Sequence, residues 1–339
     1  MNHRTGIGDL IWHLPYLRAA AKVSAGGTIT VIARPSSRAV EILSVEPSVS
    51  RVIEFDIHMH AGWRERWRAQ LELRKALVAA GIERILIFST RIRYAAIALL
   101  AGVPRRSGFG FSLGQRLLLN EPPFIDPYEG DGNWVYPEAT AFAIAHGLVS
   151  GPVVPRMALP QHLVTTHETA IAHLPRPLFG IVIGGSDPRR NWGAERFAGL
   201  LAELTDRGCG ALVVGGPPEQ AIADRIGQRL SPHARRHTEF AVQSSVLKSA
   251  ALLRQCDFCV GNDTGALNIA AALEVPSLGL FGVSPPLRHD PILHAVTGQG
   301  MEAISVARVM ERLAELDAFQ IRVSPRRRAL ELSTSAPES

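Results

Sequence analysis

The chain has 339 residues, 46% of them hydrophobic and 20% charged, which is enough apolar material for roughly two domains and excludes wholesale disorder. Its 36 Lys and Arg against 31 Asp and Glu leave a formal charge of only +5, too small to indicate nucleic-acid binding by itself. Three cysteines are too few for a disulfide framework, and no segment is as long and apolar as a membrane span, so we expect a cytoplasmic protein.

Short β-branched segments alternate with amphipathic segments through the first half of the chain. We expect helices at 10–21, 37–44, 63–80, 91–101 and 137–146, and strands at 28–33, 51–55 and 84–88. Between 102 and 133 the glycines and prolines indicate loops, with one short amphipathic piece at 113–119. This alternation predicts βαβ units with parallel strands.

The same alternation resumes in the second half, after a segment at 147–160 with three prolines and two glycines. We expect strands at 178–183, 211–214, 258–260 and 277–281, and helices at 194–207, 219–230, 243–254, 265–273 and 306–316. The predicted domains are therefore 1–154 and 155–322, followed by a flexible basic and polar tail at 323–339. Each domain is expected to be Rossmann-like, with ligands bound at the carboxyl ends of its strands.

The first candidate loop is Gly6-Ile7-Gly8-Asp9, ahead of the first expected helix. Gly6 and Gly8 allow a tight backbone and close approach of a ligand. Asp9 has two interpretations that the segment leaves open. It is a favoured N-cap residue, or it is a general base that takes the proton of an acceptor hydroxyl. Only five residues precede the loop, so we expect the strand before it to be very short or to begin upstream of this sequence.

The second candidate loop is the segment GGSDPRRNW, which follows an expected strand. Gly184 and Gly185 let backbone N–H groups approach phosphate oxygens, and Ser186 can donate a hydrogen bond. Arg189 or Arg190 can neutralise a diphosphate. Together these residues favour an anion site over a solvated loop.

The third candidate loop, GNDTG, lies between a buried strand and the helix expected at 265–273. Asp263, Thr264 and Gly265 stand at the helix N-terminus, where free N–H groups and the positive end of the helix dipole favour an anion. Asp263 or Thr264 can instead simply cap the helix, and the two interpretations can both hold.

Three further features have weaker functional interpretations. Cys256 and Cys259 form a single C-x-x-C and are expected to be structural. The acidic residues Asp126, Glu129 and Asp131 lack an Asp-x-Asp pattern and are expected to form a solvated turn.

The helix at 63–80 opens with Trp-Arg-Glu-Arg-Trp-Arg. In one interpretation one ring is packed and the outer face is simply charged. In the other, the run is a basic aromatic patch that contacts an anionic acceptor or a membrane interface. The same alternatives apply to the three arginines at 326–328.

Five motifs in this order resemble glycosyltransferase family 9, the lipopolysaccharide heptosyltransferases, over about residues 5–316. They are GIGDL with LPYLR, RNW with FAGL, VGGPPE, GNDTG with AAAL, and LFG. The resemblance implies an α/β GT-B fold, in which two Rossmann-like domains with parallel sheets face a central cleft. It also implies that the N-terminal domain binds the acceptor and the C-terminal domain binds the donor.

The resemblance further implies an inverting, metal-independent glycosyltransferase that needs no cofactor. The expected donor is a nucleotide-diphosphate sugar, ADP-heptose, and the expected acceptor is the lipopolysaccharide core or a related glycan. The family's catalytic base corresponds to Asp9. Its phosphate-binding cation, usually lysine, corresponds to Arg190, and its diphosphate-binding loop corresponds to Asp263, Thr264 and Gly265.

On the acceptor side we expect Gly6, Gly8 and Arg64. The expected partners are the donor, a glycolipid or oligosaccharide acceptor, and the anionic inner face of the bacterial inner membrane. No nucleic acid is expected, because no basic groove with interleaved aromatic residues is present. Asn268 stands where the family often has histidine, and Gly193 where it usually has proline. An epimerase or a non-catalytic nucleotide-sugar-binding protein on the same fold are the alternatives.

Overall fold

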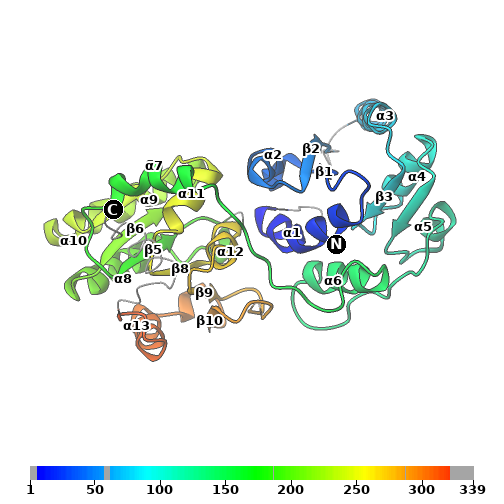
Figure 1. Ribbon diagram of the computed structural model, residues 1–339. Helices are drawn as coiled ribbons and strands as arrows, with labels where there is room; N and C mark the ends of the chain where they lie inside the picture. Colours follow the sequence, from blue (N-terminus) through cyan, green and yellow to red (C-terminus); the bar gives the residue numbers. More distant parts are fainter. Residues whose placement is uncertain (1–5, 57–61, 186, 287, 321–339) are drawn as a thin grey trace, which may run out of the picture. The chain divides into compact units, whose positions relative to one another are not determined.

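The computed structural model describes residues 6–56, 62–185, 187–286 and 288–320, and the chain divides into two compact units, Met1–Ala158 and Leu159–Ser339 (Figure 1). Every strand pair in both units is parallel, which confirms the predicted α/β alternation. Within the described ranges, no helix has the length and apolarity needed to cross a membrane. The strand expected before the first loop, residue Ser186 and the tail at 323–339 lie outside these ranges.

The N-terminal unit contains two two-stranded ladders, β1–β2 and β3–β4, with helices before and between the strands. In chain order its elements are α1 (Ile7–Lys22), β1 (Ile29–Ala33), η1 (Pro35–Ser37), α2 (Ala39–Ile42), η2 (Leu43–Val45), β2 (Val49–Glu54), α3 (Trp63–Ala79), β3 (Arg84–Ile87), α4 (Ile92–Leu100), β4 (Arg105–Gly108), α5 (Leu113–Leu118) and α6 (Val135–Ala145). Most bounds agree with the expected ones to within three residues.

Two local differences in this unit have clear physical causes. The single helix expected at 37–44 is divided into η1, α2 and η2, and the break between η1 and α2 lies at Arg38, which adopts a left-handed conformation with φ 56°. Strand β4 lies in the segment expected to be loop. Its sequence, Arg-Arg-Ser-Gly, has no apolar alternation, and pairing with β3 is what makes it a strand.

The C-terminal unit is built on one six-stranded parallel sheet in the order β10-β9-β8-β5-β6-β7. Its elements are α7 (Gln161–Ile171), β5 (Leu178–Val182), η3 (Pro188–Arg190), α8 (Ala194–Asp206), β6 (Gly210–Val214), η4 (Pro217–Glu219), α9 (Gln220–Arg229), α10 (Pro232–Arg236), β7 (Thr238–Ala241), α11 (Val246–Leu253), β8 (Phe258–Asn262), α12 (Gly265–Ala272), β9 (Ser277–Phe281), β10 (Leu293–Thr297), η5 (Met301–Ala303) and α13 (Val306–Glu315). The sequence patterns did not predict α7, α10 or the two edge strands β7 and β10.

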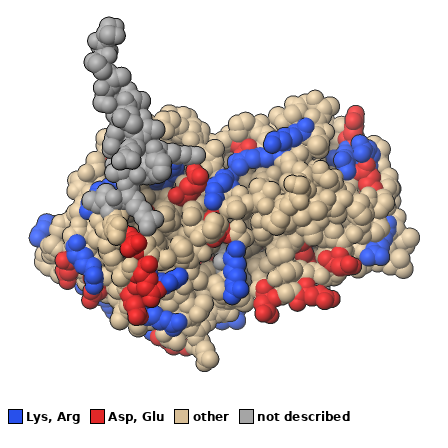
Figure 2. Space-filling model, turned by 60° about the horizontal axis from the view of Figure 1, so that its bottom comes forward, with Lys and Arg blue, Asp and Glu red and all other residues tan. Residues whose placement is uncertain are grey.

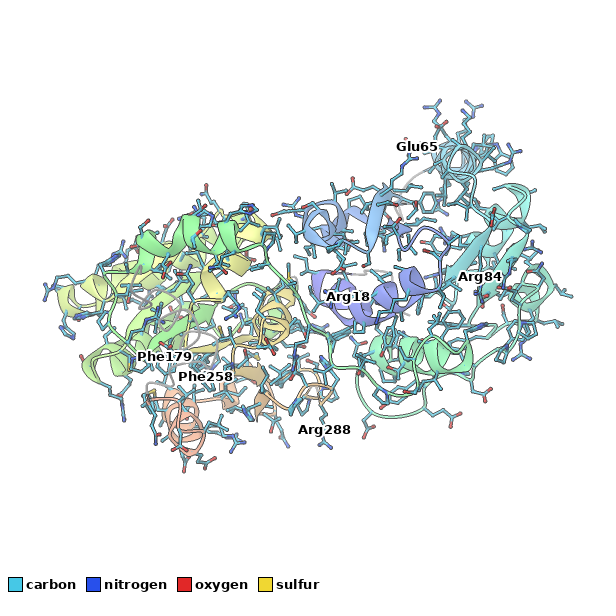
Figure 3. The ribbon with its side chains drawn as sticks, viewed as in Figure 1. Arg18, Glu65, Arg84, Phe179, Phe258 and Arg288 are labelled. Carbon is cyan, nitrogen blue, oxygen red and sulfur yellow. The ribbon has the colours of Figure 1, made fainter. Side chains whose placement is uncertain are left out.

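The central strands of this sheet are buried along their whole length, because helices cover both faces. Phe179 of β5 and Phe258 of β8 lie side by side there, with ring centroids 6.0 Å apart (Figure 3). Close packing also requires glycine at Gly261, where a Cβ atom would overlap the carbonyl oxygen of Val182. Strands β5 and β8 are therefore held in tight contact.

The strand order of this sheet reverses between β5 and β8, which are adjacent in space although two strands intervene in sequence. In open parallel sheets, such a reversal leaves a crevice at the carboxyl ends of the two strands, and ligands bind there. The second candidate loop follows β5 and the third follows β8. The fold therefore brings two predicted loops to the same point.

Charged side chains are interspersed on the face shown in Figure 2, where blue and red groups alternate. The excess of Lys and Arg over Asp and Glu, which gives the formal charge of +5, does not form a continuous basic surface on this face.

Candidate functional site

The loop after β5 is fastened to β8 by one buried side chain, Asn262. Its Nδ2 donates to the carbonyl oxygens of Ile183, at 2.9 Å, and Gly184, at 3.1 Å. Its Oδ1 accepts from the backbone N–H of Trp192 at 3.1 Å. Asn262 is fully buried, and its bonds to Ile183 and Trp192 are shielded from water, while the bond to Gly184 is partly buried. This side chain fixes both ends of the Gly184–Trp192 loop relative to β8.

Trp192 anchors the far end of that loop. Its ring is fully buried, its Nε1 donates to the carbonyl oxygen of Ile304 at 2.7 Å, and it packs edge-on against Phe197. Gly193 follows with φ 98°, a conformation that side chains rarely adopt, and starts α8. A glycine here, in the position where the family usually has proline, thus turns the chain directly into the helix.

The two arginines of the loop have different surroundings. Arg189 is 76% exposed and pairs with Asp187, whose pKa that hydrogen bond lowers to about 2. Arg190 is directed inward instead, and its Nη1 donates to Oδ2 of Asp263 at 2.8 Å. Ser284 donates to the same oxygen at 2.7 Å. Of the two arginines, Arg190 is the one that the structure brings to the Asp263-Thr264-Gly265 loop.

Two buried polar atoms at this point have no hydrogen-bond partner among the described residues: Nε of Arg190 and Oγ1 of Thr264. Thr264 occupies the N-cap position of α12 but its side chain makes no cap bond, so the interpretation of Thr264 as a simple cap is wrong. Gly265 is the first residue of the helix, where N–H groups point outward. Arg190 Nε, Thr264 Oγ1 and the start of α12 together offer hydrogen-bond donors to an anion.

Asn268 lies one turn into α12, and its Nδ2 donates to the carbonyl oxygen of Thr264 at 2.9 Å. It is 5% exposed. At this position the chain therefore has a neutral side chain that holds the Thr264 backbone. Of the other predicted members of the site, Gly184 and Gly185 lie at the end of β5, and Ser186 is not described.

In the N-terminal unit, Asp9 lies in the first turn of α1. Its Oδ2 accepts from the backbone N–H of Gly6, the N-cap residue, at 2.9 Å, and the side chain is 8% exposed. Gly8 lies inside the helix rather than in a loop before it. One turn on, His13 Nδ1 lies 2.6 Å from the Asp9 carbonyl oxygen, and burial lowers the pKa of His13 below its ordinary value. The interpretation of Asp9 as the N-cap residue is therefore wrong: Gly6 is the N-cap, and Asp9, three residues on, accepts a hydrogen bond from its backbone.

Arg64 lies on α3, a helix at the edge of the N-terminal unit (Figure 1). Its guanidinium carbon stands 5.2 Å from the centre of the Trp63 ring. Trp63 is 74% exposed and Trp67 59% exposed, so the interpretation in which one ring is packed is wrong.

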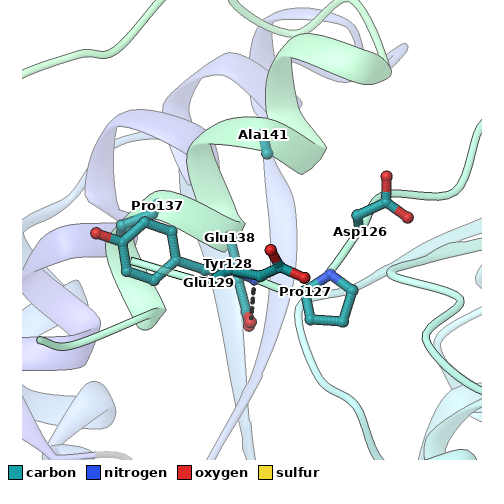
Figure 4. Close-up of a pocket in the computed structure, with 7 residues that line it drawn as sticks. All are labelled: Asp126, Pro127, Tyr128, Glu129, Pro137, Glu138 and Ala141. Atoms are coloured by element: carbon teal, nitrogen blue, oxygen red, sulfur yellow. Dashed lines mark hydrogen bonds between the residues drawn. The ribbon is translucent and has the colours of Figure 1, made fainter. Parts of the chain in front are cut away.

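A pocket of about 460 Å3 lies beside α6 (Figure 4). Glu138 lines it, buried, with a pKa that burial raises above its ordinary value. Tyr128, which donates its backbone N–H to Glu138, lines it too, with Asp126 and Glu129. The solvated turn expected at these acidic residues is therefore partly the wall of a pocket.

The comparison with known proteins identifies the family. A sequence model of glycosyltransferase family 9 (heptosyltransferase) matches residues 70–315. The chain belongs to glycosyltransferase family 9.

Curated relatives of this family 9 chain are heptosyltransferases by name. Lipooligosaccharide heptosyltransferase 2 of Haemophilus ducreyi is 31% identical over 121 residues, which cover 34% of this chain and 35% of the relative. Lipopolysaccharide heptosyltransferase 2 of Escherichia coli is 23% identical over 237 residues, which cover 64% and 66%. The matched region thus spans between about a third and two thirds of the length of these relatives.

The fold of this family 9 chain is also that of a solved structure. The E. coli ADP-heptose lipopolysaccharide heptosyltransferase II matches 92% of this chain and 96% of its own, with a TM-score of 0.73 and 20% sequence identity. The predicted α/β, GT-B fold is therefore confirmed.

Two residues of this candidate site were not assigned a role from the sequence. Asn262 lies within the GNDTG motif, and its place at the end of a buried strand was the available signal. Ser284 lies beyond β9 and had no signal, because only the fold brings it to Asp263.

Replacing Asn262 with alanine should lower the free energy of unfolding by roughly 2–4 kcal/mol, because two buried backbone groups and one partly buried group lose a hydrogen bond. Urea denaturation measures this effect. Asn191→Ala is the matched control, since Asn191 is exposed and makes one local bond, to the Gly193 N–H at 2.9 Å. Equal losses in the two variants would show that Asn262 does not fasten the loop.

Proposed function

We propose that this protein is an inverting glycosyltransferase that transfers a heptose from ADP-heptose to a hydroxyl of a lipopolysaccharide-core or related glycan acceptor. Family membership and the heptosyltransferase names of its relatives support the sugar and the acceptor class. The donor is suggested by the similar E. coli protein, whose name specifies ADP-heptose.

The observation that carries this proposal is a pair of buried atoms near the start of α12, Nε of Arg190 and Oγ1 of Thr264, that have no hydrogen-bond partner among the described residues. A buried polar atom without a partner costs about 1–3 kcal/mol. The oxygens of a diphosphate accept hydrogen bonds and carry negative charge, so they would pair with both atoms and with the N–H groups of α12. The diphosphate of the donor fits this arrangement.

Asp263 has a positioning role in this proposal. Its carboxylate would repel a phosphate if it faced one directly. It accepts hydrogen bonds from Arg190 and Ser284 and has a side chain only 10% exposed. We therefore assign Asp263 to holding the Arg190 guanidinium, with Nε left to meet the ligand.

On the acceptor side, Asp9 is the proposed base. Its carboxylate takes the proton of the attacking hydroxyl while that oxygen bonds to the anomeric carbon of the donor sugar. The bond from this carbon to the diphosphate breaks, and its electron pair leaves with ADP. Arg190 and α12 stabilise the charge on the departing diphosphate. Attack opposite the leaving group inverts the configuration of the anomeric carbon.

The test is incubation of the full chain with ADP-heptose and a truncated lipopolysaccharide-core acceptor. Mass spectrometry should show acceptor enlarged by one heptosyl unit, and NMR should show inverted anomeric configuration. ADP-heptose incubated alone distinguishes an epimerase, which would isomerise the sugar without acceptor. Binding of ADP by calorimetry with no transfer to any acceptor would indicate a non-catalytic binding protein.

A further inference from the structure

Exposed apolar side chains are concentrated on three consecutive helices of the N-terminal unit. Among the described residues, fifteen large hydrophobic side chains are exposed, and nine of them lie on α3, α4 and α5. The nine are Trp63, Trp67, Leu71, Val78, Ile92, Leu99, Leu100, Leu113 and Leu117. A cluster of this kind marks an interaction surface rather than scattered exposure.

Helix α3 carries the most strongly apolar part of this surface. Trp63, Trp67 and Leu71 recur every four residues, so they form one stripe along the helix. The stripe faces away from the core, because Leu73 and Leu77 are the residues that α3 buries. Figure 3, in which Glu65 marks α3, shows side chains of this helix projecting outward from the unit. Among the described residues, the rings of Trp63 and Trp67 therefore lie mainly on the surface of this unit.

Positive charge accompanies the stripe. Arg64 and Arg68 each follow a tryptophan by one residue, about 100° further round the helix. The five Lys and Arg of α3 outnumber its two Glu, giving 5 − 2 = +3. Helices α4 and α5 add one arginine each and no acidic residue. The apolar stripe is therefore bordered by cations.

The surface continues from α3 to its neighbours. Arg74 Nε donates to the carbonyl oxygen of Leu100 at 2.8 Å, which joins α3 to the exposed end of α4. At the other end of α4, Ile92 lies against Gly114 of α5. The three helices contact one another in this order, at one edge of the unit (Figure 1).

We propose that the surface formed by α3, α4 and α5 binds the headgroup region of an anionic lipid bilayer. Tryptophan rings lie at the membrane interface because they are amphipathic, and arginine pairs with lipid phosphates there. A second copy of the chain fits less well, since two surfaces of the same positive charge would face each other. This inference goes beyond the proposed transfer and is tested without either substrate.

The experiment is sedimentation of the full chain with vesicles, using phosphatidylcholine alone or phosphatidylcholine with phosphatidylglycerol. The protein should partition onto the anionic vesicles and less so at high salt. Replacing Arg64, Arg68 and Lys75 with glutamine should weaken this partition on the order of 100-fold, from about fivefold per charge. The control replaces Arg225, Arg236 and Arg308 of the C-terminal unit, which are also exposed, with glutamine.

Tryptophan fluorescence supplies a second readout that does not depend on charge. Of the other three tryptophans, Trp12 and Trp192 are buried and Trp134 is half-buried, so insertion of the exposed Trp63 and Trp67 should shift the emission to the blue on anionic vesicles. The variant Trp63→Phe with Trp67→Phe should lose that shift and keep its circular dichroism spectrum. Unchanged partition after Trp63→Ser with Trp67→Ser would overturn the proposal. A concentration-dependent dimer of the wild-type chain that is lost in these serine variants would also overturn the proposal.

Discussion

Replacing Asp9 with asparagine should lower kcat by a factor of about 10² to 10⁴, the usual contribution of a general base, and leave the affinity for ADP unchanged. The physical reason lies in two roles of one side chain. The carboxylate caps α1 by accepting the Gly6 N–H at 2.9 Å. Asparagine also offers an oxygen to that N–H but cannot take a proton from a hydroxyl. Steady-state transfer assays and ADP calorimetry separate the two roles.

Asp9→Ala is the comparison for this variant. It loses the base and the hydrogen bond to the Gly6 N–H together, so its free energy of unfolding should fall by about 0.5–1.5 kcal/mol, whereas that of Asp9→Asn should stay close to wild type. If Asp9→Asn kept near-full turnover on a verified acceptor, Asp9 would be a capping residue only. If both variants lost ADP binding, the assignment of Asp9 to the acceptor side would be wrong.

Replacing Arg190 with alanine should raise the Kd for ADP about 10- to 100-fold, since a hydrogen bond to a charged group contributes about 1.5–3 kcal/mol. The loss has two parts. Nε no longer meets the diphosphate, and the Asp263 carboxylate, which Arg190 pairs at 2.8 Å, is left to repel it. Calorimetry with ADP measures the change, and kcat/KM for the sugar donor should fall with it.

Arg189→Ala is the matched control, because the neighbouring residue has the same charge but is 76% exposed and bonded to Asp187. It should leave the Kd for ADP within about twofold, consistent with the small contribution of exposed ion pairs. Arg190→Lys should retain part of the affinity, since lysine keeps the charge but lacks the planar guanidinium. Equal effects of the Arg189 and Arg190 variants would contradict the placement of the diphosphate at α12.

The buried strands were predictable because their sequences are simple. LFGIV at β5 is apolar throughout, and SLGLF at β9 is apolar after its first residue, as is typical of strands covered on both faces. The edge strands were not predictable from their sequences. Strand β7 (Thr-Glu-Phe-Ala) and β4 (Arg-Arg-Ser-Gly) show no such pattern, and their neighbours impose the extended conformation.

The anion site was predicted in parts. Glycines after a strand and a Thr-Gly at a helix N-terminus are local signals, visible in the sequence. The local sequence does not show whether Arg189 or Arg190 enters the site. This depends on how η3 turns the chain after Asp187. The exposure of both tryptophans on α3 could not be predicted either. The spacing of apolar residues along a helix does not show whether a neighbouring helix covers a given ring.

The sequence by itself determined the α/β alternation, the parallel strands, the family and the three segments that hold candidate chemistry, because each of these depends on short-range patterns of apolar residues, glycines and helix starts. That the first of these segments, Gly6 to Asp9, is the start of α1 and not a loop came from the structure. Only the tertiary structure decided that Asn262 fastens the β5 loop to β8 and that Asp263 holds Arg190. It also decided that Nε of Arg190 and Oγ1 of Thr264 are buried with no partner in the part of the chain that the structure describes. The physical reason is the strand order. The reversal between β5 and β8 places residues about 70 positions apart in sequence within hydrogen-bonding distance, and no local pattern encodes that distance.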